Sequence, residues 1–177
     1  MSERKRGKAK AKKQRRVAVI LIDMQKRFVC DLRREDKERI IPSQIEVIRF
    51  CAENAIPLVV LNFMGFGNVI TELAVEIAKV PKRITLARDD NDGFVNPELE
   101  EYLFDNKIET VILMGINADF CVKATGHSAI QNGFKIATAE SLIAGLPYHR
   151  EDNNAPWYRK NGLFDSDHEN LLNSVLG

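Results

Sequence analysis

From Val17 onward, short apolar runs alternate with longer amphipathic stretches. This alternation is typical of βαβ units around a parallel sheet, because strands buried on both faces are continuously apolar and crossover helices are apolar on one side. The apolar runs predict strands at residues 17–22, 58–62, 84–86, 111–114 and 135–137. The amphipathic stretches predict helices at residues 42–54, 71–78, 97–106, 120–132 and 169–176.

These elements predict a single α/β domain over residues 17–177, folded as a three-layer α/β/α sandwich. Because crossovers between parallel strands are right-handed, the sheet is expected to be doubly wound and mainly parallel, as in Rossmann-like folds. A chain of 177 residues with 45% hydrophobic residues can bury one full core and leaves no room for a second domain. Ligands of such sheets bind outside the carboxyl ends of the strands.

Residues whose side chains could take part in binding or catalysis follow the predicted strands at that edge. Asp23 and Gln25 follow the first strand, Asn62 and Phe63 lie at the end of the second, and Arg88 follows the third. Each also has an ordinary structural interpretation: Asp23 could cap a helix, and Arg88 could pair with a neighbouring aspartate at the surface. Their convergence on one crevice favours a functional site.

Cys121 is expected at the same edge, because it follows the fourth predicted strand. The strand breaks at Gly115, and the turn delivers Cys121 to the start of a predicted helix. Unpaired amide N–H groups and the helix dipole at such a position favour the thiolate over the thiol, which suits a nucleophile. The alternative is a buried core thiol, since free cysteine is among the most buried residue types.

The net charge of +1 conceals a strongly basic start of the chain. Residues 1–16 hold nine Lys or Arg residues and one acid, Glu3, whereas the rest of the chain holds 17 basic and 24 acidic residues. A segment this polar cannot bury enough apolar surface to fold, so residues 1–16 are predicted to form a disordered basic arm. The arm could bind nucleic acid through charge; a solubilising or targeting extension, or an arm lying on its own acidic domain, is the alternative.

The sequence contains neither an apolar run of about 18 residues nor a signal-peptide pattern, so no membrane association is expected. Its cysteines, Cys30, Cys51 and Cys121, are odd in number and include no CxxC pair. This usage suggests neither a disulfide framework nor a thiolate zinc site. A soluble, cytoplasmic protein is expected.

Two segments resemble the isochorismatase-like cysteine hydrolases, the superfamily that includes nicotinamidases and N-carbamoyl amidases. The segment VAVILIDMQKRF at residues 17–28 resembles the first strand of that family, which ends in Asp-x-Gln with an aromatic residue shortly after. The segment GINADFCVKAT at residues 115–125 resembles its glycine-turn-cysteine-valine motif. Phe94, with Leu99 and Leu103 on a helix, resembles the stretch that follows the catalytic lysine of the family.

The resemblance implies a role for each matching residue. Cys121 would be the nucleophile and Asp23 the general base that receives its proton. It also implies a cis peptide bond between Ile116 and Asn117, and an oxyanion hole made by the backbone N–H groups of Asn117 and Cys121. The side chains expected in the substrate pocket are Gln25, Phe28, Asn62, Phe63 and Phe94.

Arg88 departs from the family pattern, which places a lysine six residues before the position of Phe94. Arginine retains a positive charge that lowers the thiol pKa and orients Asp23, but it cannot readily release a proton. The first hypothesis is therefore a cysteine hydrolase that cleaves the carbon–nitrogen bond of a small amide, ureido or carbamoyl compound through a thioester, with Arg88 as its third catalytic residue. The second is a catalytically impaired binding or scaffold protein on the same fold, and the third is a protein that associates with nucleic acid through the basic arm.

No metal and no other cofactor is predicted. Metal-dependent nicotinamidases have an Asp-x-His and a nearby second His after their second strand, and residues 62–81 contain no histidine. The histidines of this chain, His127, His149 and His168, lie late and far apart in the sequence. The presence of Cys121 favours carbonyl hydrolysis over vinyl-ether cleavage, because isochorismate-cleaving relatives work without that cysteine. The expected partners are a small-molecule substrate and other copies of the chain in a homo-oligomer.

Overall fold

The computed structural model describes residues 16–147 and 155–176 of the chain. The predicted disorder of the basic arm therefore concerns residues outside the described part, except at Arg16. Arg16 is attached to the domain, because its carbonyl oxygen accepts hydrogen bonds from the amides of Glu109 and Thr110. Its guanidinium also pairs with the Glu109 carboxylate.

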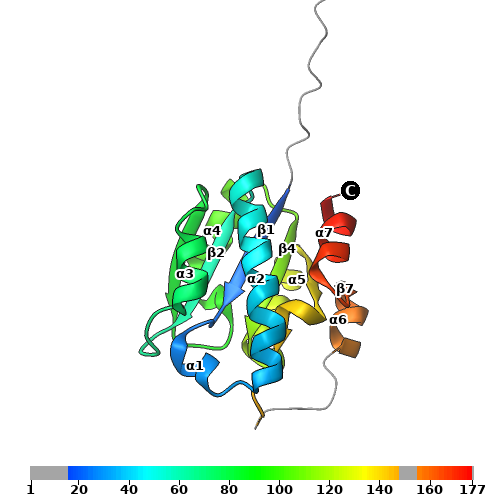
Figure 1. Ribbon diagram of the computed structural model, residues 1–177. Coiled ribbons are helices and arrows are strands. Elements are labelled where there is room, and N and C mark those ends of the chain that lie inside the picture. The colour runs from blue at the N-terminus through cyan, green and yellow to red at the C-terminus, as the bar shows by residue number, and fades with distance from the viewer. Residues whose placement is uncertain (1–15, 148–154, 177) are drawn as a thin grey trace, which may run out of the picture.

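A parallel sheet forms the centre of the domain (Figure 1). Within the described residues its strands are β1 (Val17–Ile22), β2 (Leu58–Phe63), β3 (Arg83–Arg88), β4 (Thr110–Ile116), β5 (Lys135–Ala139), β6 (Ile143–Ala144) and β7 (Leu163–Asp165). Their order is β3-β2-β1-β4-β5-β7, with β6 paired to β4. The order reverses direction at β1, so the carboxyl ends of β1 and β4 are neighbours at the switch point where such sheets bind ligands.

Helices cover both faces of this sheet, which confirms the predicted three-layer sandwich (Figure 1). The helices are α1 (Lys26–Cys30), α2 (Arg34–Asn54), α3 (Thr71–Ile77), α4 (Pro97–Asp105), α5 (Cys121–Gln131), α6 (Ala155–Asn161) and α7 (His168–Leu176). Short 3₁₀ turns lie at Gly93–Val95 and Glu140–Leu142. Every residue of β1 is buried, because helices pack on both of its sides. No helix among the described residues is both long and apolar enough to cross a membrane.

All of the predicted strands and helices are present, but the start predicted for the second helix is wrong. That prediction placed Pro42 at the first helical position, whereas α2 begins at Arg34 and carries Pro42 in its interior. The added turns are supported by ion pairs along the helix, Arg34 with Glu38 and Arg39 with Asp36. The short elements α1, α6, β6 and β7 carry too few residues for a periodic pattern and were not predicted.

Candidate active site

The close approach of β4 to β1 sets the geometry of the candidate site. Gly115 pairs with Ile22, and a Cβ atom on Gly115 would lie 2.0 Å from the Ile22 carbonyl oxygen. Gly115 also has a φ of +132°, so only glycine allows this contact. Asp23, the residue after Ile22, has a φ of 53°, in the left-handed region that aspartate tolerates. Its amide donates a hydrogen bond to Leu61 O at 3.0 Å. The backbone therefore fixes where the Asp23 carboxyl points.

Arg88 and Asp23 form a buried ion pair at this edge. Arg88 Nη2 lies 2.6 Å from Asp23 Oδ2, and the two side chains are 0% and 1% exposed. The guanidinium also donates to the Asp90 carbonyl through Nη1 and lies over the Phe63 ring, 5.2 Å from its centroid. Arg88 is thus neither a surface partner of the neighbouring aspartates nor a loosely held cation.

The Cys121 thiol completes this cluster. Cys121 is the first residue of α5 and is 7% exposed. Its thiol donates to Asn91 Oδ1 at 3.4 Å and also interacts with the Asp23 carboxyl. The structure therefore brings together the acid, the cation and the thiol that were predicted at three separate strand ends.

The electrostatics of the thiol differ from the expectation of a ready thiolate. Burial, reinforced by the negative charge of Asp23, raises the pKa of the Cys121 thiol to about 11, and the positive charge of Arg88 only partly opposes this. Burial also raises the pKa of the Asp23 carboxyl, against the opposing effect of Arg88. The resting pair is therefore a protonated thiol beside a carboxylate, which suits proton transfer to Asp23 when substrate arrives better than it suits a preformed nucleophile.

We expect alkylation of Cys121 by iodoacetamide to be slow at neutral pH. With a thiol pKa of about 11, only about one thiol in 10⁴ is ionised at pH 7, and the rate should rise about tenfold per pH unit toward pH 11. Peptide mapping by mass spectrometry measures the rate in a Cys30→Ser variant, which lacks the exposed thiol. A rate that has already levelled off near pH 6 would contradict the protonated resting state.

The turn before α5 presents polar groups to the same place. The peptide bond between Ile116 and Asn117 is cis, at the position that the family resemblance implied. The Cys121 amide begins α5 and has no helical carbonyl to bind. Asn117 is 5% exposed, and its Nδ2 has no hydrogen-bond partner among the described residues. The Tyr158 hydroxyl, from α6, donates a hydrogen bond to Ala118 O at 2.7 Å and so holds the turn in place.

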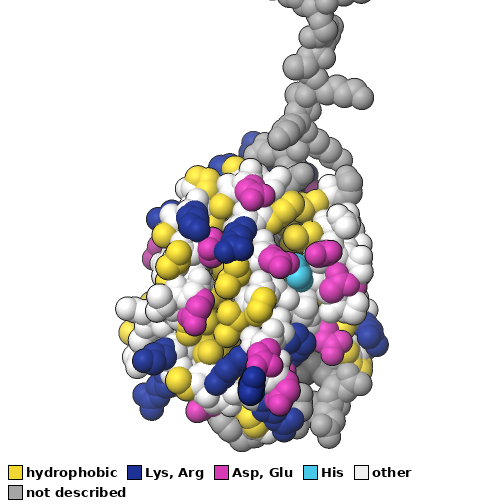
Figure 2. All heavy atoms as spheres, viewed as in Figure 1, with side chains coloured by type: hydrophobic (Ala, Val, Ile, Leu, Met, Phe, Trp, Pro, Cys, Tyr) yellow, Lys and Arg dark blue, Asp and Glu magenta, His cyan; other side chains and the backbone are white. Residues whose placement is uncertain are grey.

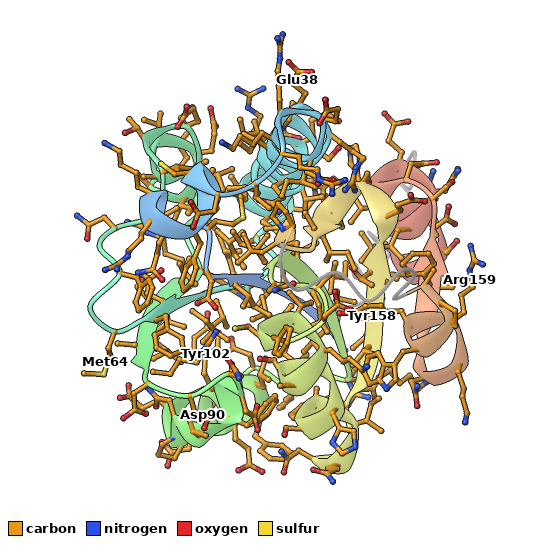
Figure 3. All side chains as sticks on the ribbon, turned by 90° about the horizontal axis from the view of Figure 1, so that it is seen from below. Glu38, Met64, Asp90, Tyr102, Tyr158 and Arg159 are labelled. Atoms are coloured by element: carbon orange, nitrogen blue, oxygen red, sulfur yellow. The ribbon has the colours of Figure 1, made fainter. Side chains whose placement is uncertain are left out.

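Figure 3 looks onto the carboxyl edge of the sheet. Met64 points outward at the periphery of this view, and its side chain is 58% exposed. Tyr158, by contrast, lies within the fold and is 1% exposed. Tyr158 is thus a packing residue that supports the site from α6, in line with the usual role of a buried tyrosine whose hydroxyl is satisfied.

The aromatic side chains of Phe28, Phe63 and Phe66 form an aromatic wall on one side of the cluster. The Phe28 and Phe66 rings stack with centroids 4.5 Å apart, and Phe63 meets both edge-on at 6.2 and 5.2 Å. The Arg27 guanidinium covers the Phe66 ring at 4.9 Å. Phe28 and Phe63 were predicted here from the sequence, whereas Phe66 lies in the loop after β2 and was missed.

The other predicted pocket residues have different surroundings. Gln25 is 1% exposed and braces the loop after β2: its Oε1 accepts from the Phe63 amide at 2.7 Å, and its Nε2 donates to Phe63 O at 3.0 Å and Gly67 O at 2.5 Å. The Phe94 ring, in the 3₁₀ turn after β3, packs against the Phe134 ring, with centroids 6.1 Å apart. Asn62 Oδ1 is buried without a partner among the described residues. Gln25 thus shapes the aromatic wall, and Phe94 supports the loop that holds Asn91.

Asn91 is the main site residue that sequence reasoning missed. Helix α5 holds the far end of the loop after β3: the Ser128 hydroxyl donates to Asp92 Oδ2 at 2.5 Å, and the Gly93 amide donates to Thr125 Oγ1 at 2.9 Å. This brings Asn91 to the Cys121 thiol. The rule that ligands bind beyond the carboxyl ends of strands would have found Asn91 had it been extended past Arg88 into the loop.

Comparison with known proteins decides the family. The family model of the isochorismatase domain matches residues 17–155. The chain belongs to the isochorismatase family. In this member of the family, the buried acid, cation and thiol described above lie at the switch point of the sheet.

Individual relatives of this family member are distant. A stretch of 63 residues is 32% identical to the nicotinamidase of Escherichia coli (strain K12), spanning 36% of this chain and 30% of that protein. The structure of N-carbamoylsarcosine amidase from Thermoplasma acidophilum is similar with a TM-score of 0.72 and 23% identity, over 86% of this chain and 98% of that one. The MAR1 ribonuclease of Caenorhabditis elegans has a TM-score of 0.74 and 17% identity, over 93% and 83%. These two structures show a shared fold.

Proposed function

We propose that this protein hydrolyses the carbon–nitrogen bond of a small amide, ureido or carbamoyl compound, with Cys121 as the nucleophile. The observation that carries the proposal is the convergence of Asp23, Arg88 and Cys121 from separate strand ends into one buried cluster. The alternative of an impaired scaffold is not favoured, because Arg88 keeps the Asp23 carboxyl paired, oriented and next to the thiol.

In each half of the proposed reaction, Asp23 first accepts a proton and then returns it. Asp23 takes the thiol proton as Cys121 Sγ attacks the carbonyl carbon, and the backbone N–H groups of Asn117 and Cys121 bind the resulting oxyanion. Asp23 then protonates the leaving nitrogen, the carbon–nitrogen bond breaks, and an acyl-thioester remains. Water, deprotonated by Asp23, attacks the thioester, and the departing thiolate recovers the proton. Arg88 stays charged throughout and acts by holding Asp23, so no lysine proton is needed.

A panel of substrates tests the reaction class. The full chain is incubated with primary amides, N-carbamoyl amino acids and ureido compounds, and ammonia release is followed. We expect saturable turnover of at least one class, equal in the wild type and in a Cys30→Ser control, because Cys30 is exposed at the end of α1 and its thiol is not one of the buried groups of the cluster. Ammonia release no faster than that of protein fully alkylated at Cys121, over the whole panel, would reject the proposal.

Association between copies belongs to the same proposal. Two large apolar side chains near the site are exposed: Met64, which follows Phe63 in the sequence, by 58%, and Phe120, which precedes Cys121, by 41%. Large apolar side chains this exposed suit a contact with a second copy. We therefore propose a cytoplasmic homo-oligomer in which a neighbouring copy helps to close the substrate pocket. Nucleic-acid binding by the basic arm stays a separate hypothesis about residues outside the described part.

A further inference from the structure

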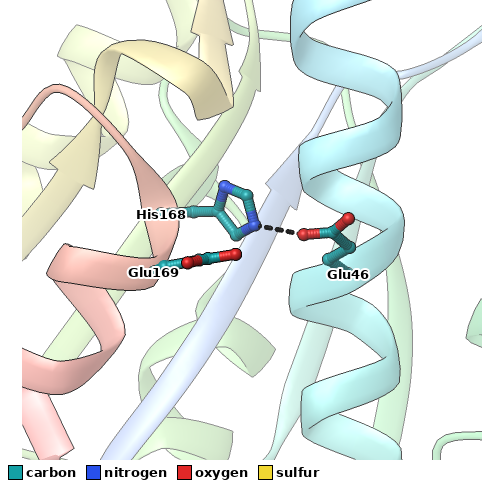
Figure 4. A group of neighbouring side chains, drawn as sticks. All are labelled: Glu46, His168 and Glu169. Carbon is teal, nitrogen blue, oxygen red and sulfur yellow. Dashed lines mark hydrogen bonds and ion pairs between the residues drawn. The ribbon is translucent and has the colours of Figure 1, made fainter.

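Two helices far apart in the sequence bring a histidine and two glutamates together, away from the candidate active site. Glu46 projects from α2, and His168 and Glu169 are the first residues of α7 (Figure 4). Glu46 and His168 are 122 positions apart in the chain. The three residues each offer one metal-ligating atom, and these atoms all lie within 4.8 Å of one another.

The histidine of this cluster is held in place. His168 is 9% exposed, and its Nε2 lies 2.6 Å from Glu46 Oε2. Its other ring nitrogen, Nδ1, lies 3.4 Å from the Ser141 hydroxyl. Histidines that ligate metals generally have such a hydrogen-bond partner on the second nitrogen, which sets the orientation of the ring and the site of its proton.

The carboxylates of the cluster form no ion pair with a lysine or arginine within residues 16–147 and 155–176. The positive charge of Arg49 reaches Glu46 only as a longer-range attraction. The nearest arginine along α2, Arg49, pairs instead with Glu76 at 2.9 Å. Figure 2 shows acidic side chains on either side of a histidine on this face. The cluster thus combines one imidazole nitrogen with two carboxylates.

We propose that Glu46, His168 and Glu169 bind a divalent transition-metal ion, with Zn²⁺ as the best match and water in the open coordination position. One imidazole nitrogen and two carboxylate oxygens form a ligand set that zinc accepts, whereas Mg²⁺ prefers oxygen ligands alone. Ligands of a tetrahedral zinc ion lie about 3.3–3.5 Å apart, which follows from Zn–N and Zn–O distances of about 2.0–2.2 Å. The 2.6 Å separation of His168 Nε2 and Glu46 Oε2 would therefore have to open as the ion enters, and the exposed Glu169 side chain would have to turn toward the ion.

Binding requires the ring proton to move. Without metal, His168 Nε2–H donates to the Glu46 carboxylate, since an ionised carboxylate only accepts. A metal ion needs the Nε2 lone pair, so the proton must lie on Nδ1, where Ser141 Oγ can accept it. The ion would replace a hydrogen bond between α2 and α7 with coordinate bonds. The sequence predicted no metal because it compared the histidines only with one another and could not place Glu46 beside His168.

Zinc binding by the full-length chain tests this site. A Cys30→Ser background removes the exposed thiol, and equilibrium dialysis then measures the bound zinc. We expect one Zn²⁺ per chain, and at least tenfold weaker binding in His168→Gln, Glu46→Gln and Glu169→Gln. His127→Gln and Glu38→Gln, at exposed positions on α5 and α2, are the matched controls and should bind as the background does. Zinc at one hundred times its Kd should also raise the melting temperature of the background by about 5–10 °C, and that of Glu169→Gln by much less.

Two results would overturn the site. One is zinc affinity in Glu46→Gln and Glu169→Gln equal to that of the controls; these exposed substitutions should not disturb folding, so they decide the matter even if His168→Gln is unstable. The other is zinc binding that persists in all three variants but is lost in Cys121→Ala, which would place the ion at the catalytic thiol. Because the substrate panel reports on Cys121 and the dialysis on α2 and α7, either proposal can fail without the other.

Discussion

Replacing Cys121 with alanine is expected to lower turnover at least about 10⁴-fold on the substrate that the wild type hydrolyses best. Removal of a catalytic nucleophile leaves only the oxyanion donors and substrate binding, which preserve a small residual acceleration. The substitution removes Sγ, the atom that would form the thioester. It also removes the contacts of this nearly buried thiol with Asn91 and Asp23. The measurement is kcat/KM from ammonia release, together with the melting temperature of the variant.

Cys51→Ala is the matched control for this variant. Cys51 is also a buried cysteine, 0% exposed in α2, and burial raises the pKa of its thiol to about 12. Its truncation should cost some stability through the small cavity that it leaves, with little change in kcat/KM. If Cys121→Ala kept turnover within tenfold of the wild type, or if both alanine variants lost turnover equally, Cys121 would not be the nucleophile.

The strand-end residues show what the sequence could predict about this site. Asp23, Arg88 and Cys121 each follow an apolar run, and parallel strands bring such positions to one edge, so local pattern and topology were enough to place them together. Asn91 and Phe66 lie in loops whose paths depend on tertiary hydrogen bonds, such as those that Thr125 and Gln25 make to the backbone. Such contacts leave no periodic pattern in the sequence.

The protonation state of Cys121 shows a different limit. The sequence located a helix start and a nearby cation, both of which lower a thiol pKa. It could not tell how deeply the thiol is buried or that the Asp23 carboxylate adjoins it, and both raise the pKa. The balance of opposing effects on one group depends on three-dimensional distances.

The start of α2 was predicted wrongly for the same reason. The ion pairs and the buried face that extend the helix before Pro42 are visible only in the fold.

Replacing Arg88 with methionine is expected to affect both folding and turnover. The side chain is fully buried, and its loss leaves the Asp23 carboxylate unpaired in a site that is 1% exposed. Breaking a buried ion pair in this way lowers the free energy of unfolding by about 3–5 kcal/mol. Turnover should fall by at least about 10²-fold, since a misplaced or protonated Asp23 cannot act as the base. Urea unfolding and kcat/KM measure the two effects.

The stability loss in Arg88→Met should depend on pH. Burial already raises the Asp23 pKa, and Arg88 opposes that rise, so removing Arg88 raises the folded-state pKa further. The folded variant then holds a proton that the unfolded chain releases near its ordinary aspartate pKa of about 3.9. Its stability relative to the wild type is therefore greatest below that pH and falls as pH rises through the raised folded-state pKa. A destabilisation equal at pH 4 and pH 8 would contradict this account of the pair.

The double variant Asp23→Asn/Arg88→Met separates the structural role of the pair from its catalytic role. Without either charge, no unpaired ion is buried, so the double variant should recover much of the stability that Arg88→Met loses. It should recover no turnover, because asparagine cannot accept the thiol proton. Arg88→Lys keeps the charge near Asp23 but loses the donation to Asp90 O and the contact with the Phe63 ring, so its turnover should lie between those of the wild type and Arg88→Met. Equal turnover in Arg88→Met and the wild type would show that Asp23 does not need the cation, and would remove Arg88 from the proposed mechanism.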